Sequence, residues 1–245
     1  MLKASVLITI GLLCAGTALA EEEGIRLLES GTDIDSTESL QRGARNFMNY
    51  CSGCHSLKYL RYNRLAADLK IPESELGNLI FTPAKPFDEI NTAMPADATD
   101  WFGKRPPDLT LMGRERGTNY IYSYLHGFYQ DKTRPWGVNN LYLSGTAMPH
   151  VLGTLQGLQK PVYKNEKDPH GSAKMVLVGV EAMTPGAMKP EEYDQFIRDI
   201  ANFLDYAAEP VKAKRESMGI FVVLLLLVFF VFAYLLKKEY WKDVH

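Results

Sequence analysis

Two stretches of the chain carry apolar residues at the spacing of an amphipathic helix. The apolar positions of the first are Leu40, Ala44, Phe47 and Met48. Asp35 followed three residues later by Glu38 is typical of a helix start, so the pattern predicts a helix that leads into Cys51. Gly43 inside this helix costs about 1 kcal/mol relative to alanine, which favours a close contact with another helix at that position.

The second stretch runs from Glu191 to Ala207, after Lys189-Pro190 and before Pro210. Its apolar stripe comprises Tyr193, Phe196, Ile197, Ile200, Phe203, Leu204 and Ala207. Because such a stripe has to be buried, we expect this helix and the first one to cross and to close a pocket. The same pattern is also compatible with a plain helical core.

An uncharged run without proline extends over 18 residues, from Gly219 to Leu236. As a helix it would rise about 27 Å, which is close to the thickness of the hydrocarbon layer of a membrane. Lys237 and Lys238 follow it and can reach the headgroups. The run predicts one transmembrane helix over residues 218–236, followed by a short tail at 237–245.

The middle of the chain, from Ile71 to Lys189, is rich in proline, glycine and aromatic residues and has weak periodicity. We therefore expect short helices joined by long ordered loops. Within it, the stretch from Val162 to Pro190 indicates a surface excursion that includes a short hairpin. Long loops in a compact domain need an organising centre, and a large, flat, apolar cofactor would provide one.

The first 20 residues have the features of a secretory signal peptide. Lys3 supplies the positive start, Val6 to Leu13 the apolar run, and Ala18-Leu19-Ala20 the small-residue cleavage site. Cys14 lies inside this segment, so the exported chain from residue 21 keeps two cysteines. Without Lys3 its net charge is about −3, which argues against nucleic-acid binding.

The two remaining cysteines form the motif Cys51-Ser52-Gly53-Cys54-His55. Covalent haem attachment requires this spacing, because the thiols add to the two vinyl groups and the adjacent imidazole reaches the iron. A redox disulfide would need a thioredoxin-like βαβ context and a zinc site a second ligand pair, and neither is present. We therefore predict one covalently bound haem c. The aromatic candidates to cover it are Trp101, Phe102, Tyr120, Tyr122, Tyr124, Phe128, Tyr129 and Trp136.

The ligand on the other side of the iron decides between electron transfer and an open site for gas or peroxide chemistry. Met94 and Met148 both precede proline, which favours an extended backbone that can approach the haem face. The spacing alone leaves these two methionines open. The remaining histidines are His126, His150, His170 and His245, of which the last lies in the predicted tail.

Four further motifs resemble the cytochrome c1 family. They are Arg105-Pro106-Pro107-Asp108-Leu109-Thr110, Arg114-x-Arg116, Gly145-Thr146-Ala147-Met148-Pro149 and Tyr206-Ala207-Ala208-Glu209-Pro210. The resemblance implies a mainly α fold, with a class I cytochrome c-like haem domain, long loop insertions and one C-terminal transmembrane helix. It also implies the following site residues: thioether bonds at Cys51 and Cys54, axial ligands His55 and Met148, a propionate partner in Arg116, and packing of Pro106 and Pro107 on the haem edge. A guanidinium fork suits a carboxylate such as a haem propionate.

The same resemblance implies an electron-transfer subunit of ubiquinol:cytochrome c oxidoreductase, an electron carrier by itself. It would pass electrons from a Rieske iron-sulfur protein to a cytochrome c, beside cytochrome b and membrane lipid in a dimeric bc1 complex. The haem domain, residues 21–217, would lie in the periplasm and the tail in the cytoplasm of a bacterial cell. Two alternatives stay open: a free membrane-anchored monohaem cytochrome, and a haem sensor or peroxidase with an open sixth position.

The sequence also departs from the family pattern. His150 follows Met148-Pro149, where mitochondrial relatives tend to carry small residues and prolines, and the middle insertion is shorter than theirs. The chain therefore resembles the compact bacterial form, which leaves the shape of its docking surface undetermined.

Overall fold

The computed structural model describes residues 25–92, 94–95, 97–167 and 173–243. The predicted signal peptide, His170 and His245 lie outside these residues. The longer helices are α2 (Thr37–Tyr50), α3 (Tyr62–Asp68), α7 (Thr118–His126), α9 (Pro190–Ala208) and α10 (Lys212–Tyr240). The short ones are α4 (Glu73–Leu76), η1 (Gly77–Leu79), α5 (Ala98–Phe102), α6 (Met112–Glu115) and α8 (Gly153–Gln156). The strands are β1 (Leu57–Arg61), β2 (Glu89–Ile90), β3 (Phe128–Gln130), β4 (Val138–Asn140), β5 (Gln159–Lys167) and β6 (Ala173–Ala182).

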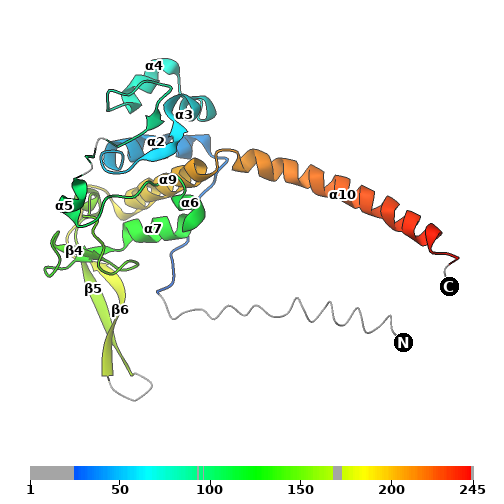
Figure 1. The fold of residues 1–245 in the computed structure, drawn as a ribbon. Helices are drawn as coiled ribbons and strands as arrows, with labels where there is room; N and C mark the ends of the chain where they lie inside the picture. The colour runs from blue at the N-terminus through cyan, green and yellow to red at the C-terminus, as the bar shows by residue number, and fades with distance from the viewer. Residues whose placement is uncertain (1–24, 93, 96, 168–172, 244–245) are drawn as a thin grey trace.

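Helices α2 and α9 cross at the centre of the domain, with α3 and α4 to one side and α6 and α7 to the other (Figure 1). The crossing is close because α2 carries Gly43, where a Cβ atom would lie only 2.7 Å from the Cβ of Phe203 and 2.8 Å from the carbonyl carbon of Asp199. The predicted crossing pair and the predicted contact at Gly43 are therefore confirmed. The fully buried aromatic side chains Phe47 and Phe203 meet at this crossing, with their ring centroids 5.6 Å apart.

The start of α2 differs from the prediction by one residue. Ser36, rather than Asp35, is the N-cap, and its hydroxyl accepts a hydrogen bond from the backbone N–H of Ser39 at 3.4 Å. The N–H of Asp35 instead donates to Asp33 Oδ1 at 3.0 Å, which holds Asp35 in the preceding turn. Serine and aspartate are nearly equivalent caps, so the sequence pattern does not distinguish two adjacent candidates.

The middle of the chain has the short helices and ordered loops that its weak periodicity predicts. The described residues form three small antiparallel pairs: β1, which precedes this region, with β2, and within it β3 with β4 and β5 with β6. The β5–β6 hairpin runs from the pair Gln159–Ala182 to the pair Lys167–Ala173 and projects from the domain (Figure 1). The predicted hairpin is thus confirmed, and it begins three residues before Val162.

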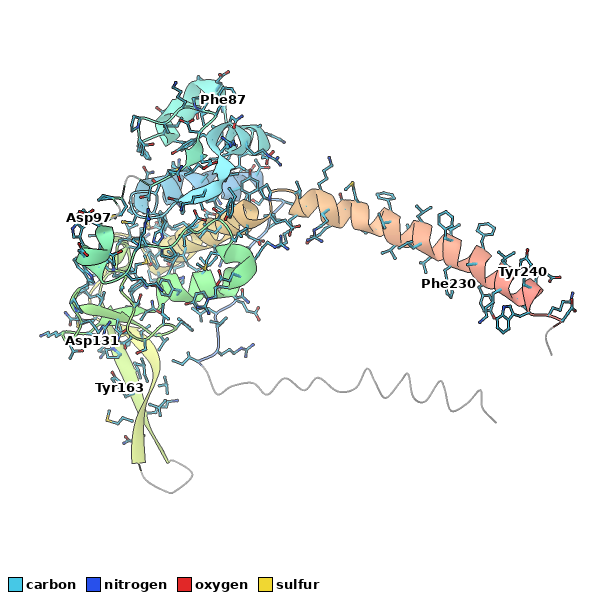
Figure 2. The ribbon with its side chains drawn as sticks, viewed as in Figure 1. Phe87, Asp97, Asp131, Tyr163, Phe230 and Tyr240 are labelled. Carbon is cyan, nitrogen blue, oxygen red and sulfur yellow. The ribbon has the colours of Figure 1, made fainter. Side chains whose placement is uncertain are left out.

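Helix α10 leaves the domain as one continuous helix of 29 residues (Figure 1). It is the one helix among the described residues that is long and apolar enough to cross a membrane, with a mean hydropathy of 3.1 over its most apolar part. Its large side chains are exposed along its whole length, and Figure 2 shows the labelled Phe230 and Tyr240 on this helix, outside the domain. An exposed apolar surface of this length requires lipid or other apolar helices around it.

Candidate haem-binding site

The cysteine motif begins where α2 ends. The N–H groups of Cys51 and Ser52 both donate to Phe47 O, at 2.8 and 3.0 Å, which closes the last turn of the helix. The N–H groups of Cys54 and His55 then donate back to Cys51 O, at 3.0 and 2.8 Å. This tight turn fixes both cysteines and the histidine relative to the end of a rigid helix.

His55 is held by the predicted proline pair. Its Nδ1 lies 2.8 Å from the backbone carbonyl oxygen of Pro107. A carbonyl oxygen only accepts hydrogen bonds, so Nδ1 carries the proton and Nε2 keeps a free lone pair. This tautomer is the one that binds a metal through Nε2. Burial lowers the pKa of His55, whereas the bond to Pro107 and the charge of Asp108 oppose that shift.

Two further bonds fix the segment that carries Pro107. The N–H of Leu109 donates to Ser56 O at 2.9 Å, and the N–H of Lys58 donates to Asp108 Oδ2 at 2.9 Å. The Pro107 carbonyl that accepts the His55 proton is therefore held in place by hydrogen bonds to the residues just after His55. Pro106 is half-buried and Pro107 is exposed.

Both thiols of the motif are free. Burial raises the pKa of Cys51 to about 12 and also raises the pKa of Cys54. Cysteines of redox motifs have a lowered pKa, because the thiolate is their reactive form. Neutral, half-buried thiols next to a metal-competent imidazole fit thioether attachment rather than disulfide exchange.

Met148 lies in a loop that is fixed by side chains from the β3–β4 region. Gly145, at φ +75°, accepts a hydrogen bond from Arg134 Nη2 at its oxygen, at 2.9 Å, and donates to Asn139 Oδ1 at 2.8 Å. The left-handed backbone at Gly145 turns the chain toward the core. Met148 is half-buried and packs against the same hydrophobic core as Cys51.

The competing methionine, Met94, has different surroundings. Its N–H donates to Thr92 Oγ1 at 3.1 Å, and the hydroxyl of Thr92 donates to Gly53 O at 2.8 Å. The backbone of Met94 therefore lies beside the turn that carries both motif cysteines and His55.

The predicted propionate partner, Arg116, is exposed and follows the short helix α6. Its guanidinium carbon lies 4.8 Å from the centre of the Tyr120 ring. No ion pair of Arg116 occurs among the residues that the structure describes. The group is thus available for an external carboxylate. A free imidazole Nε2, two free thiols, a thioether and this guanidinium fit a covalently bound haem.

The predicted aromatic residues divide into separate groups. Phe102 packs against Trp136 with centroids 5.2 Å apart, and Trp101 and Trp136 are largely exposed. Tyr124 and Phe128 face the methionine loop. Tyr122 instead points to α9, where its hydroxyl bonds Asp194, so it belongs to the helix interface.

Of the candidate histidines, His126 and His150 lie among the described residues, and each packs against aromatic side chains. His126 lies between the rings of Tyr122 and Tyr193, at 4.6 and 5.3 Å, in the interface of α7 and α9. His150 is stacked on Phe128, with centroids 4.7 Å apart and ring planes within 5° of parallel. Burial lowers the pKa of His150 to about 4.

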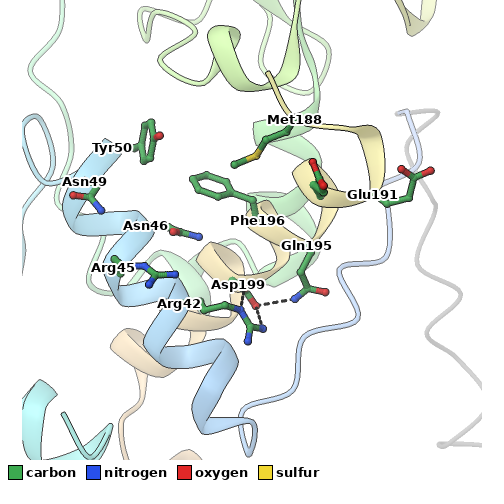
Figure 3. Close-up of a pocket in the computed structure, with 11 residues that line it drawn as sticks. Arg42, Arg45, Asn46, Asn49, Tyr50, Met188, Glu191, Gln195, Phe196 and Asp199 are labelled. Carbon is green, nitrogen blue, oxygen red and sulfur yellow. Dashed lines mark hydrogen bonds and ion pairs between the residues drawn. The ribbon is translucent and has the colours of Figure 1, made fainter. Parts of the chain in front are cut away.

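A shallow depression of about 600 Å³ lies between α2 and the start of α9 (Figure 3). It is lined by polar groups of α2, including Arg45 and Asn49, and by Met188 and Phe196 across from them. The close-up shows Arg42 and Gln195 directed at Asp199 on its floor. None of the cysteines, His55 or Met148 lines this depression, so it is separate from the candidate haem site.

The fold and this set of donor groups define a membrane-anchored c-type haem protein. A model of the cytochrome C1 family matches residues 32–244. Cytochrome c1 of Allochromatium vinosum is 53% identical over 237 residues, which cover 96% of each chain. The chain belongs to the cytochrome c1 family, so it carries one covalently bound c-type haem and is an electron-transfer subunit of the bc1 complex.

Two other relatives carry different names. A protein named ammonia monooxygenase gamma subunit, from Nitrosomonas europaea, is 39% identical over 236 residues, or 96% of this chain and 95% of that protein. A protein named cytochrome b/c1, from Bradyrhizobium diazoefficiens, is 26% identical over 244 residues, or 84% of this chain and 33% of that protein. The family identified from the sequence motifs is confirmed, and with it the haem-domain fold class.

Sequence reasoning missed the hydrogen bonds that brace the two loops, although it had named most of the residues that form them. Pro107 contributes its carbonyl oxygen to His55, and Thr92 bonds the attachment turn. Tyr124 shares a hydrogen bond with Thr146 beside Met148. The position of Thr146 inside the methionine motif indicated that its hydroxyl could brace this loop. Its partner could not be identified, because Tyr124 lies 22 residues away in the chain.

Proposed function

We propose that this chain passes electrons from a Rieske iron-sulfur protein to a c-type cytochrome, through a haem bound by Cys51 and Cys54 and ligated by His55 and Met148. When bound, the haem supplies a one-electron couple, and a His/Met ligand pair gives it a high reduction potential. The bond from His55 Nδ1 to Pro107 O carries the proposal, because it leaves Nε2 as a fixed metal-competent nitrogen beside the two thiols.

The chain's own residues then have distinct tasks. The turn after α2 orients the imidazole, and the loop through Gly145 presents a soft, neutral thioether. Arg116 would pair with a propionate, and Pro106 and Pro107 would pack at the haem edge. With both axial positions filled, the oxidation state changes with little rearrangement, which suits electron transfer rather than gas or peroxide chemistry.

The family membership and the apolar helix α10 support a place beside cytochrome b in a membrane. The name cytochrome b/c1 of one relative agrees with that partner. We further propose a dimeric complex in a bacterial inner membrane, with lipid around α10. The haem domain would lie in the periplasm with its tail, residues 237–245, in the cytoplasm, and the signal peptide at 1–20 would direct this orientation. The proposed donor and acceptor then meet the haem outside the membrane.

The ligand assignment is tested by Met148→Ala in the full-length, haem-loaded chain. We expect loss of the sulfur-to-iron charge-transfer band of the ferric protein, binding of carbon monoxide to the reduced protein, and a lower reduction potential. Met94→Ala is the matched control and leaves all three unchanged. Carbon monoxide binding by the Met94→Ala variant, with Met148→Ala unaffected, contradicts the assignment.

The place in the complex is tested separately by purification from membranes. We expect the chain to co-purify with a dihaem cytochrome b and a Rieske protein. Isolation of a fully haem-loaded chain without either partner, and with its electrons going to another oxidase or reductase, would instead support a free membrane-anchored cytochrome.

A further inference from the structure

We infer that Tyr124 and Phe128 form a clamp that holds the Met148 loop on both sides of the methionine and thereby keeps its thioether in the ligating position. The inference rests on the proposed ligation by Met148. It concerns positioning residues, because neither aromatic side chain supplies a ligand atom.

The first contact lies two residues before Met148. The hydroxyl of Tyr124 and Thr146 Oγ1 share a hydrogen bond of 2.7 Å, and the N–H of Met148 approaches the same Thr146 oxygen at 3.4 Å. Thr146 is buried, with 7% of its surface exposed. Burial raises the pKa of Tyr124 to about 12, so its hydroxyl keeps its proton at neutral pH. The hydroxyl of Thr146 therefore links Tyr124 of helix α7 to the backbone N–H of Met148.

The second contact lies two residues after Met148. The imidazole of His150 is stacked on the ring of Phe128, which is 1% exposed. A Cβ at Gly153 would come within 3.1 Å of His150 Cδ2, so the ring is also closely approached by the backbone of α8. The stack consequently fixes the position of the His150 ring.

The two contacts belong to one unit. Tyr124 and Phe128 meet edge to face, with ring centroids 5.2 Å apart. The backbone oxygen of Tyr124 accepts a hydrogen bond at 2.7 Å from Asn140 Nδ2, whose side chain is fully buried. The short segment from Thr146 to His150 is therefore attached at both ends to the same rigid surface, and a ligand held in this way needs little ordering when it binds.

The expected effect of removing one contact is modest and measurable. A buried neutral hydrogen bond contributes about 1 kcal/mol, which corresponds to about a fivefold change in an equilibrium. We therefore expect Tyr124→Phe to increase about fivefold the apparent affinity of ferric, full-length, haem-loaded protein for added imidazole, which competes with the methionine. The charge-transfer band of the methionine–iron bond reports the displacement.

Matched variants separate a specific effect on the Met148 loop from a general destabilisation of the domain. Tyr193→Phe removes another buried tyrosine hydroxyl, which donates to Leu125 O at 3.0 Å next to Tyr124, and it should leave the imidazole affinity unchanged. Thr146→Val should raise the imidazole affinity at least as much as Tyr124→Phe, because it also removes the acceptor of the Met148 N–H. The double variant should not exceed Thr146→Val, and Thr146→Ser should behave like the unmodified chain.

The second half of the clamp has its own pair of variants. His150→Phe keeps a flat ring on Phe128 and should preserve the imidazole affinity, whereas His150→Ala removes the stack and should raise it. Equal effects of the two would show that the stack is not what positions the loop. An unchanged affinity in Tyr124→Phe, or an equal rise in Tyr193→Phe, also overturns the clamp.

Failure of the clamp is distinguishable from failure of the proposed ligand. If the charge-transfer band persists in Met148→Ala, the ligand assignment and the clamp are both wrong. If Met148→Ala abolishes the band while Tyr124→Phe and Thr146→Val leave the imidazole affinity unchanged, only the clamp is wrong.

Discussion

Substitution of Gly43 by alanine should destabilise the protein, although alanine is the better helix former. The added Cβ would lie 2.7 Å from Phe203 Cβ and 2.8 Å from the carbonyl carbon of Asp199. Carbon atoms in contact prefer about 3.5–4.0 Å, and the carbonyl oxygen of Asp199 lies closer still, so α2 and α9 would have to separate by at least about 1 Å. Overpacking of this kind typically costs about 1–3 kcal/mol, and more where backbone atoms obstruct the new group.

The helix propensity gained from Gly43→Ala offsets about 1 kcal/mol of that cost. We expect a net loss of about 2 kcal/mol, which lowers the melting temperature by roughly 4–8 °C in a chain of this size. Gly43 also lies about two helical turns before Cys51, so displacement of α2 should weaken the methionine charge-transfer band. Melting is followed by the visible circular dichroism of the haem in the full-length chain, at one heating rate for all variants.

The matched control is Gly77→Ala. Gly77 has helical dihedral angles, φ −57° and ψ −28°, and no atom lies within 4 Å of an added Cβ. This variant should melt at or slightly above the temperature of the unmodified chain, because alanine restricts the unfolded state. If Gly43→Ala melts as high as Gly77→Ala, the close approach of the two helices is not the reason for the glycine.

Two further predictions concern buried polar groups. Arg42→Ala should cost about 2–3 kcal/mol of unfolding free energy, because the carboxylate of Asp199 is only 2% exposed and loses the two bonds, of 2.7 and 3.0 Å, that it accepts from Arg42. Arg64→Ala, which breaks a half-exposed pair with Asp68, should cost less than about 1 kcal/mol, and equal costs would refute the role of burial. Burial lowers the pKa of His126, so the folded chain binds fewer protons than the unfolded chain and its stability should fall as the pH drops below about 6.5. His126→Gln should flatten this dependence between about pH 7 and pH 5 in denaturant titrations, and an unchanged slope would contradict the assignment.

Local patterns predicted helices α2, α9 and α10 well, whereas they did not place α3 and α7. The stripe from Tyr193 to Ala207 depends only on the 3.6-residue period, and α9 extends one residue beyond the prediction at each end. The glycine at 43 indicated a close contact, because its low helix propensity requires a reason in the tertiary structure. The cysteine motif could also be recognised from the sequence, because its chemistry depends only on the spacing of residues within a stretch of five.

Contacts between distant parts of the chain were not predictable in the same way. Tyr124 and Thr146 are ordinary residues in their own segments, and only the loop geometry between them brings their hydroxyls together. The acceptor for His55 is a backbone carbonyl, and every residue has one, so the amino-acid sequence does not show which carbonyl is used. Met94 and Met148 both precede proline, so local reasoning left them equal and the family motif decided between them.

Helix α9 connects the candidate site to the membrane anchor. It packs on α2, which ends in the cysteine motif, and on α7, which carries Tyr124. At its other end, Lys212 Nζ at the start of α10 lies 2.7 Å from the buried carboxylate of Asp205, and Arg215 Nε lies 2.6 Å from Glu209 Oε1. Exposed ion pairs contribute little to stability, but these two join consecutive helices across a short linker and so restrict the angle between them. Helix α9 therefore joins the helix that ends in the cysteine motif to the apolar helix α10, so a displacement of α10 at its start would be passed to α2 through one packed element.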